Sequence, residues 1–312
     1  MSRAVVFPGQ GSQAVGMGRE LAEAFACARH VFEEVDEALQ QKLSAIMWDG
    51  PESELTLTEN AQPALMAVSV AVARVLAEQG GWKIGEQAKF VAGHSLGEYS
   101  ALAAAGTFSL ADTARLLKIR GQAMQKAVPV GQGAMAALLG ADLDIAREIA
   151  AEAAQGEVCE AANDNAPGQV VLSGSKAAID RAIAIAATKG LKRSVLLPVS
   201  APFHCALMQP AADAMADALA KVDMKAPVVP VVANVVASAV SSPDEIRKLL
   251  VAQVTGTVRW REGVLFMKEQ GVTNLVEVGS GKVLAGLAKR IDKELAAVSL
   301  QTPADIEAFL KA

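Results

Sequence analysis

The chain alternates short apolar runs with longer stretches in which apolar residues recur every three or four positions. The short runs predict strands at Ala4 to Phe7, Lys89 to Ala92, Val228 to Asn234 and Asn274 to Val278. The longer stretches predict helices at Gly18 to Ala26, Cys27 to Leu39, Pro63 to Glu78, Leu110 to Val128, Pro243 to Val254, Trp260 to Gln270 and Val283 to Arg290. This alternation of strands and helices is typical of an α/β fold with a parallel sheet.

The pattern changes in the middle of the chain. Strands are predicted at Ala134 to Leu139, Val158 to Asn163, Gln169 to Ser173 and Lys192 to Pro198, and a turn at Asp164 to Gly168. Helices are predicted at Leu143 to Ala154 and Ala177 to Thr188. The resulting order, β-α-β-β-α-β, is that of the ferredoxin-like unit. We therefore expect residues 1–130 and 200–312 to form one α/β core, with residues 131–199 inserted as a small subdomain.

A G-x-S-x-G motif lies between the strand at Lys89 to Ala92 and an alanine-rich helix. Its central residue is Ser95, flanked by Gly93 and Gly97. A nucleophilic serine on a sharp strand-to-helix turn has this spacing, because a Cβ on either flanking residue would crowd the helix against the strand. Amides at the start of the following helix can stabilise an oxyanion. The motif predicts a nucleophilic Ser95; the alternative is a serine that only shapes the turn.

A serine nucleophile needs a base, and the chain has only three histidines. His30 lies within a predicted helix, and His94 is expected to support the turn by packing. His204 follows a predicted strand, where α/β folds place catalytic groups, so it is the candidate base; the alternative is a surface loop histidine. No acidic residue before His204 lies in a strand-end loop, which leaves open an imidazole oriented by a carbonyl group.

Composition narrows the class of protein. Of the 312 residues, 52% are hydrophobic and 20% are charged, which indicates an ordered globular chain. The net charge is −5 and no long basic run occurs, so nucleic acid is not an expected partner. The N-terminus passes directly into a strand pattern without the apolar region of a signal peptide. We expect a cytoplasmic protein, and a monomer.

Two further classes of feature are not expected. The apolar stretch from Pro63 to Leu76 is too short to span a bilayer and contains Arg74, so no membrane is an expected partner. Cys27, Cys159 and Cys205 are too few and too scattered for a metal site or a disulfide framework.

Taken together and in this order, several motifs resemble the malonyl-CoA:acyl carrier protein transacylases of fatty acid synthesis, relatives of polyketide synthase acyltransferase domains. The resemblance runs nearly end to end and rests on Phe7-Pro8-Gly9-Gln10-Gly11-Ser12-Gln13, Gly93-His94-Ser95-Leu96-Gly97-Glu98-Tyr99, Arg120-Gly121-Gln122, Asn163-Asp164-Asn165-Ala166-Pro167-Gly168, Ser200-Ala201-Pro202-Phe203-His204, Gln253-Val254-Thr255 and Glu277-Val278-Gly279. One departure is Gly256-Thr257, where many relatives have Ser-Pro.

The resemblance implies catalytic roles. Ser95 would take the acyl group and His204 would be its base. Gln253 would orient the histidine through an amide or main-chain carbonyl, which accounts for the missing acid. The backbone amides of Gln10 and Leu96 would form the oxyanion hole. The implied fold is an α/β-hydrolase-like core with a ferredoxin-like subdomain.

The resemblance also implies substrate contacts. Arg120 would bind the free carboxylate of a malonyl group, since a guanidinium matches a carboxylate with two hydrogen bonds. From periodicity alone we would instead expect a helix-surface arginine. Asn163 and Gln10 are expected to line the substrate site. Phe203 and Leu96 resemble the malonyl-selective pattern, with Phe203 crowding an α-methyl branch.

No cofactor or metal is expected, and the expected partners are malonyl-CoA and acyl carrier protein. Two other functions remain open at this point. An esterase or thioesterase could use Ser95 and His204, although the orienting acid and a His-Gly-Gly-Gly-type loop are missing and Arg120 is present. A non-catalytic module that docks acyl carrier protein could keep the fold without the chemistry.

Overall fold

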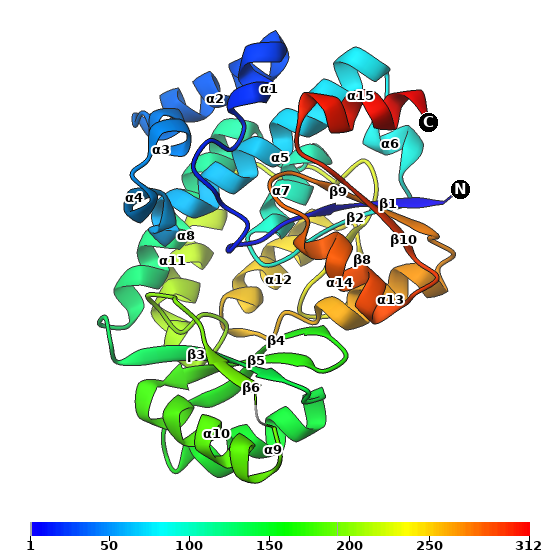
Figure 1. Ribbon diagram of the computed structural model, residues 1–312. Helices are drawn as coiled ribbons and strands as arrows, with labels where there is room; N and C mark the ends of the chain where they lie inside the picture. Colours follow the sequence, from blue (N-terminus) through cyan, green and yellow to red (C-terminus); the bar gives the residue numbers. More distant parts are fainter. Residues whose placement is uncertain (1, 192) are drawn as a thin grey trace.

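Two separate sheets organise the computed structural model, which describes residues 2–191 and 193–312 (Figure 1). The larger sheet has six strands in the order β10-β9-β1-β2-β7-β8. Their bounds are β1 Arg3–Phe7, β2 Phe90–Gly93, β7 Val231–Ala233, β8 Ser238–Val240, β9 Asn274–Val278 and β10 Ala296–Leu300. Only β8 pairs antiparallel with its neighbour; the other pairings are parallel. The predicted α/β class is therefore confirmed.

The central strand β1 is buried on both faces. Val5 and Phe7 belong to one hydrophobic cluster, and Ala4 and Val6 belong to another on the opposite face. Alternate side chains of a strand point to opposite sides, so a doubly covered strand must be apolar at every position. This explains the uninterrupted apolar run after Arg3.

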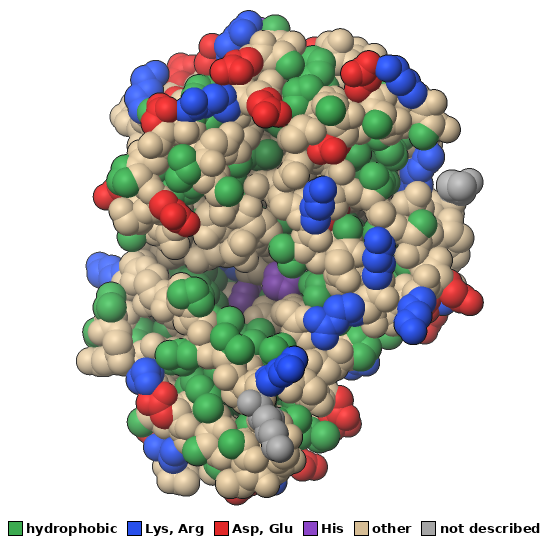
Figure 2. All heavy atoms as spheres, in the orientation of Figure 1, with side chains coloured by type: hydrophobic (Ala, Val, Ile, Leu, Met, Phe, Trp, Pro, Cys, Tyr) green, Lys and Arg blue, Asp and Glu red, His purple; other side chains and the backbone are tan. Residues whose placement is uncertain are grey.

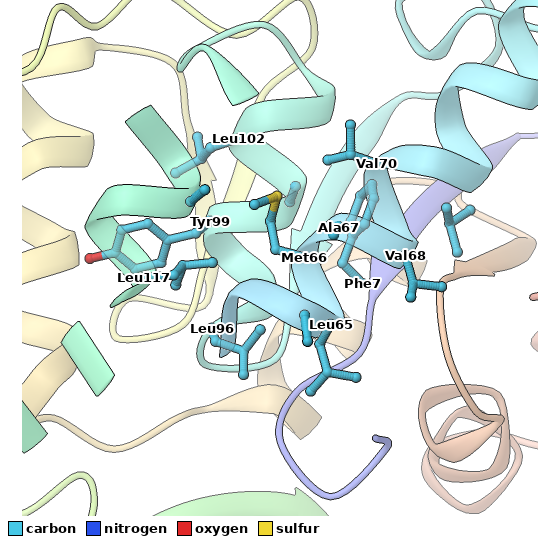
Figure 3. Close-up of a cluster of buried hydrophobic side chains, with 14 of the residues drawn as sticks. Phe7, Leu65, Met66, Ala67, Val68, Val70, Leu96, Tyr99, Leu102 and Leu117 are labelled. Carbon is cyan, nitrogen blue, oxygen red and sulfur yellow. The ribbon is translucent and has the colours of Figure 1, made fainter. Parts of the chain in front are cut away.

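Helices cover both faces of this sheet. The larger cluster joins β1 to the helices α2 Ala26–Leu39, α5 Thr58–Gly80, α7 Gly97–Ala104, α8 Leu110–Ala127, α11 Gln209–Leu219 and α12 Pro243–Thr255. Figure 3 shows part of this cluster, including Phe7 of β1, Leu65 and Met66 of α5, and Leu96 just before α7. The opposite cluster contains residues of α13 Trp260–Glu269 and α14 Val283–Ile291. The remaining helices are α1 Arg19–Ala24, α3 Leu43–Asp49, α4 Glu52–Thr56, α6 Ile84–Gln87 and α15 Pro303–Lys311, with a 3-10 turn at Ala206–Met208.

The smaller sheet is antiparallel, in the order β4-β5-β3-β6. Its strands are β3 Gly133–Leu139, β4 Cys159–Ala166, β5 Gln169–Ser175 and β6 Arg193–Leu196. The helices α9 Leu143–Ala154 and α10 Lys176–Thr188 cover the face that points away from the larger part (Figure 1). The predicted β-α-β-β-α-β order is confirmed. We propose subdomain bounds at 131 and 199, supported by a hydrophobic cluster of its own between β3 and α10.

Several predicted elements differ in their bounds. The β4 strand continues to Ala166 through the predicted turn, which is reduced to Pro167-Gly168. Asp164 and Asn165 looked like loop residues because they are polar, but Asp164 pairs with Arg261 of α13. The β7 strand begins at Val231, three residues later than predicted, directly after Pro230. Lys192, in the predicted strand Lys192 to Pro198, lies outside the described residues. The helices α3, α4, α6, α11 and α15 and the strands β8 and β10 were not predicted.

The helix α5 begins at Thr58, five residues before the predicted start at Pro63. Proline favours the first turn of a helix, which made Pro63 look like the beginning. By length and composition α5 could cross a membrane, yet 83% of its most apolar window is buried. It is a core helix of this fold, and its extra first turn carries Thr58 and Gln62 toward the site described next.

Candidate active site

Ser95 lies on the turn between β2 and α7, with φ of 54°. A positive φ is uncommon for a residue with a side chain and is concentrated at functional sites. Gly93 and Gly97 permit the turn: a Cβ on Gly93 would lie 1.9 Å from the Gly97 carbonyl, and one on Gly97 would lie 2.3 Å from the Phe7 carbonyl oxygen. The close approach of helix and strand expected from the motif is thus present.

Gly97→Ala should destabilise the protein by about 1–3 kcal/mol, because the added methyl group meets main-chain atoms of β1 that cannot move aside. Chemical denaturation measures the change. The matched control is Gly286→Ala in α14, where an added Cβ meets nothing within 4 Å. That variant should be neutral or more stable by up to about 1 kcal/mol, because alanine favours a helix. Equal effects of the two changes would contradict the packing argument.

His204 lies beside the serine although the two residues are 109 positions apart. Its Nε2 is 2.7 Å from Ser95 Oγ, and its Nδ1 is 2.8 Å from the main-chain carbonyl oxygen of Gln253. A carbonyl oxygen only accepts, so Nδ1 carries the proton and Nε2 is left to accept from the serine hydroxyl. His204 has φ of 57° and is only 4% exposed. The orienting group is a neutral carbonyl, one of the two possibilities that the sequence left open.

Hydrogen bonds from distant elements hold the turn in place. The Ser95 amide donates to Asn234 Oδ1 at 2.8 Å, and Asn234 Nδ2 donates to the Gly93 carbonyl at 2.7 Å. Gln253 Nε2 donates to the Ser95 carbonyl at 3.1 Å. Asn234 follows β7 and Gln253 lies in α12, so two elements far along the chain fix the position of the serine.

Arg120 is 1% exposed and lies at the base of the site. Its Nη1 donates to Gln62 Oε1 at 2.7 Å, and its Nη2 lies 2.9 Å from Gln253 Oε1 and 3.2 Å from Ser95 Oγ. These partners are all neutral, and among the described residues no acidic side chain forms an ion pair with Arg120. Burial lowers the pKa of the guanidinium, and a buried cation that forms no direct ion pair is costly. The arrangement favours binding of an anion beside the serine.

The surface position expected for Arg120 from periodicity alone was wrong. Leu117 and Met124, three residues before it and four after it, are both buried, so the apolar stripe of α8 runs through Arg120. A charged residue inside such a stripe is a signal that could have been recognised from the sequence.

Two residues that line the pocket at Ser95 have backbone amides that are unpaired in the described part of the chain. The amides of Gln10 and Leu96 have no acceptor among the residues that the structure describes, and both residues line the pocket at Ser95. The Ser95 amide is already occupied by Asn234, which leaves Leu96 as the first free amide of the turn. Gln10 comes close because Gly9 has no side chain: a Cβ there would lie 2.7 Å from the His94 carbonyl oxygen. This pair of donors suits an oxyanion.

The pocket has a volume of about 620 Å³ and opens between the larger and smaller parts of the molecule. Figure 2 shows this hollow, with histidine side chains at its base. Phe203 and Asn163, both expected to contact substrate, line it, as do Met124 and Met135. Arg120 makes one end of the pocket polar, and apolar side chains form its walls, which is the usual composition of a small-molecule site.

His94 bonds to another element and forms no hydrogen bond with the serine hydroxyl among the described residues. Its Nε2 is 2.7 Å from Asn165 Oδ1, and its ring lies 5.7 Å from that of Trp260. It therefore connects the turn to β4 and α13.

Cys205, next to His204, is fully buried, with its thiol 3.2 Å from the Pro202 carbonyl oxygen.

The low basicity of His204 has a measurable consequence. Burial, with a smaller contribution from the Arg120 cation, lowers its pKa to about 3. The neutral imidazole is the form that can accept a proton, so it persists well below the ordinary histidine range. The kcat/KM of a reaction that uses His204 as its base should therefore stay within about twofold of its neutral value down to about pH 5. Initial rates across this range test the expectation, and an acid limb centred near 6.5 would contradict it.

Three residues of the site were not predicted as such. Gln62 holds Arg120, Asn234 holds the turn, and Glu98 accepts hydrogen bonds from the Asn234 amide and from Gln253 Nε2. Each is a buried polar residue in a mostly apolar segment. That feature is the sequence signal that could have singled them out.

Comparison with known proteins agrees with this geometry. The family model described as "Acyl transferase domain" matches residues 4–299. The malonyl CoA-acyl carrier protein transacylases of Escherichia coli and Bacillus subtilis are 48% and 42% identical; the alignments cover 99% and 97% of this chain and 98% and 95% of those proteins.

Solved structures are similarly close. The acyl-carrier-protein-S-malonyltransferase from Bartonella henselae is 58% identical with a TM-score of 0.97, over 100% of this chain and 99% of that one. A malonyl-transacylase solved in complex with a type II PKS acyl-carrier protein is 44% identical with a TM-score of 0.96, over 100% and 99% of the chains. On the strength of the full-length match and the shared fold, this chain belongs to the acyl transferase domain family.

Proposed function

We propose that this chain transfers a malonyl group from malonyl-CoA to the thiol of acyl carrier protein through a malonyl ester on Ser95, and so supplies fatty acid synthesis. One observation carries the proposal: Arg120 is a buried cation whose hydrogen-bond partners in the described part of the chain are all neutral, and its Nη2 lies 3.2 Å from the candidate nucleophile. A malonyl group pairs a reactive thioester with a free carboxylate. The carboxylate binds Arg120 while the thioester carbonyl lies at Ser95.

The first half-reaction forms the acyl-enzyme. His204 Nε2 takes the Ser95 proton as Oγ attacks the thioester carbonyl carbon. The Gln10 and Leu96 amides stabilise the negative charge on the carbonyl oxygen. The tetrahedral intermediate then collapses, the carbon–sulfur bond breaks, and the proton on His204 passes to the departing thiolate of coenzyme A. Malonyl-Ser95 remains.

The second half-reaction reverses these steps with another thiol. His204 takes the proton of the phosphopantetheine thiol of acyl carrier protein, and the sulfur attacks the ester carbon. The carbon–oxygen bond breaks, and Ser95 recovers its proton from His204. The orienting group of His204 is the neutral Gln253 carbonyl instead of a carboxylate, which makes the imidazole a weaker base. We infer that this disfavours activation of water and limits hydrolysis of malonyl-Ser95.

The relatives support the same substrates. The names of the Escherichia coli and Bacillus subtilis proteins state malonyl-CoA and acyl carrier protein, and one similar transacylase was solved with its acyl-carrier protein. We further propose that the enzyme acts as a monomer in the cytoplasm, as expected from the sequence. The burial of α5, the one described helix long and apolar enough to span a membrane, supports a location away from the bilayer.

Mass spectrometry of the intact protein mixed with malonyl-CoA tests the function. A malonyl adduct that maps to Ser95 and disappears on addition of phosphopantetheinylated acyl carrier protein, with malonyl-carrier formed, is the expected result. Malonyl-CoA alone distinguishes an esterase or thioesterase, which would release free malonate in multiple turnovers without a thiol acceptor. No adduct at all would indicate a non-catalytic module.

Arg120→Ala should remove the preference for malonyl-CoA over acetyl-CoA, measured as the ratio of their kcat/KM values. Malonyl loses its charge partner, worth about 1.5–3 kcal/mol, whereas acetyl never had one. The wild-type kcat/KM should rank malonyl-CoA above methylmalonyl-CoA, because Phe203 crowds a branch, and above acetyl-CoA; the variant should let acetyl-CoA compete. The matched control is Arg115→Ala, on the same helix but 55% exposed. An unchanged order in Arg120→Ala would remove this residue from the acyl pocket.

A further inference from the structure

Glu98 is a buried acid that the two half-reactions do not use. It lies three residues after Ser95 in α7, is 1% exposed, and forms no ion pair among the residues that the structure describes. Its Oε2 accepts the Asn234 amide at 2.9 Å and Gln253 Nε2 at 3.0 Å. These are the two residues that hold the serine turn, so Glu98 connects them to each other through one carboxylate oxygen.

The contacts of Gln253 indicate that Glu98 affects the orientation of the Gln253 side-chain amide. The amide group of Gln253 has a donor end and an acceptor end that differ only by a half-turn of the side-chain amide. The donor end faces acceptors at Glu98, Ser95 and Asn234. The acceptor end, Oε1, faces the Arg120 guanidinium at 2.9 Å. In the reverse orientation, donors would face the guanidinium and an acceptor would face three acceptors.

Of these three acceptors, Glu98 Oε2 lies nearest to Gln253 Nε2, at 3.0 Å, against 3.1 Å for the Ser95 carbonyl and 3.3 Å for Asn234 Oδ1. The other two belong to the bonds that hold the serine turn. The Ser95 carbonyl accepts the Glu98 amide, and Asn234 Oδ1 accepts the Ser95 amide. We propose that Glu98 is a positioning residue for acyl selectivity: its Oε2 fixes the orientation of the Gln253 amide, and this amide holds Arg120 toward the acyl pocket. The proposal rests on the proposed function, because it assigns Arg120 to the malonyl carboxylate.

The hydrogen bond, and not the negative charge, is the essential feature. Both bonds end on the same oxygen, so one unprotonated oxygen at that place is sufficient. Burial raises the pKa of Glu98 to about 7, so the ionised and protonated forms coexist at neutral pH, and either form can present such an oxygen. A glutamine has an oxygen within the same reach, whereas an aspartate keeps the charge but is one methylene shorter.

The test compares acylation of Ser95 by malonyl-CoA and by acetyl-CoA, measured as single-turnover rates by mass spectrometry. The ratio of the two rates reports Arg120 alone, since general damage to Ser95 or His204 slows both. Glu98→Met removes the acceptor and should lower the ratio about tenfold, the size expected when one buried hydrogen-bond donor is left unpaired. Glu98→Gln should keep the ratio within about threefold, and Glu98→Asp should fall between them.

A Glu98→Met protein that folds and keeps the wild-type ratio overturns the proposal. If that variant does not fold, Glu98→Gln and Glu98→Asp provide the test. The proposal is supported if the ratio of malonyl to acetyl acylation rates in Glu98→Gln is closer to wild type than the ratio in Glu98→Asp. It is overturned if the ratio in Glu98→Asp is as close to wild type or closer. The matched control is Glu277→Asp, at a buried acid that caps α14 through the Leu284 and Ala285 amides. It should lower stability without moving the ratio.

The two levels of inference fail in different ways. If wild-type protein forms no malonyl-Ser95, the proposed function is wrong. If wild-type protein forms it and prefers malonyl over acetyl, but the ratio does not respond to Glu98, only the positioning role is wrong.

Discussion

Ser95→Ala should form no malonyl-enzyme on exposure to malonyl-CoA, and its transfer activity should fall to background. The variant lacks only the Oγ atom that accepts the acyl group, and no other hydroxyl lies at 2.7 Å from His204 Nε2 among the described residues. Mass spectrometry of the intact protein gives the result directly. The fold should be retained, because the hydrogen bonds that hold the turn use the Ser95 backbone and not its side chain.

The matched control is Ser100→Ala in α7, the helix that follows the Ser95 turn. The Ser100 hydroxyl is buried and has no hydrogen-bond partner in the described part of the chain, so its loss should change neither acylation nor fold. A malonyl adduct that persists in Ser95→Ala would mean that another side chain is the nucleophile. Loss of the adduct in both variants would point to damage of the helix α7 as a whole.

His204→Ala should slow acylation by about 10²–10⁴-fold, the usual contribution of a positioned base. Without Nε2, the serine must lose its proton to water while the oxyanion hole and Arg120 remain. Single-turnover rates with saturating malonyl-CoA measure the loss. Near-wild-type turnover at neutral pH would remove His204 from the mechanism.

The positive φ of His204 makes a second variant, His204→Asn, necessary. Its φ of 57° is strained for alanine, whereas asparagine tolerates this region of conformation. His204→Asn should therefore lose as much activity as His204→Ala while keeping more stability. His30→Ala, at an exposed histidine of α2, serves as the control and should leave acylation unchanged. A difference in activity between the alanine and asparagine variants would assign part of the loss to backbone strain.

Local patterns were sufficient for much of the architecture. The strand before Ser95, the flanking glycines and the helix after them are one continuous segment, so their geometry follows from steric limits on neighbouring residues. The small sheet was predictable for a similar reason, since its six elements follow one another between residues 133 and 196. One of the errors was at polar residues that bond to distant elements. Asp164 and Asn165 looked like a turn, but they lie within β4.

The site itself was only partly predictable. With three histidines in the chain, the base could be narrowed to His204 by elimination, and the absence of a suitable acid pointed to a carbonyl. Arg120 depended on the family resemblance, because a single arginine in a helix is usually exposed. Glu98, Asn234 and Gln62 were not predicted as parts of the site at all, although each is buried and hydrogen-bonded there.

The sequence by itself determined the strand-turn-helix at Ser95, the alternation of strands and helices, and the order of the inserted unit, because these depend on residues close together in the chain. The tertiary structure decided which groups meet the serine. Asn234 reaches Gly93 across 141 positions, and Gln253 reaches Ser95 across 158. Such hydrogen bonds depend on where the sheet brings distant segments, and a buried polar group bonds with whatever partner the packing places there.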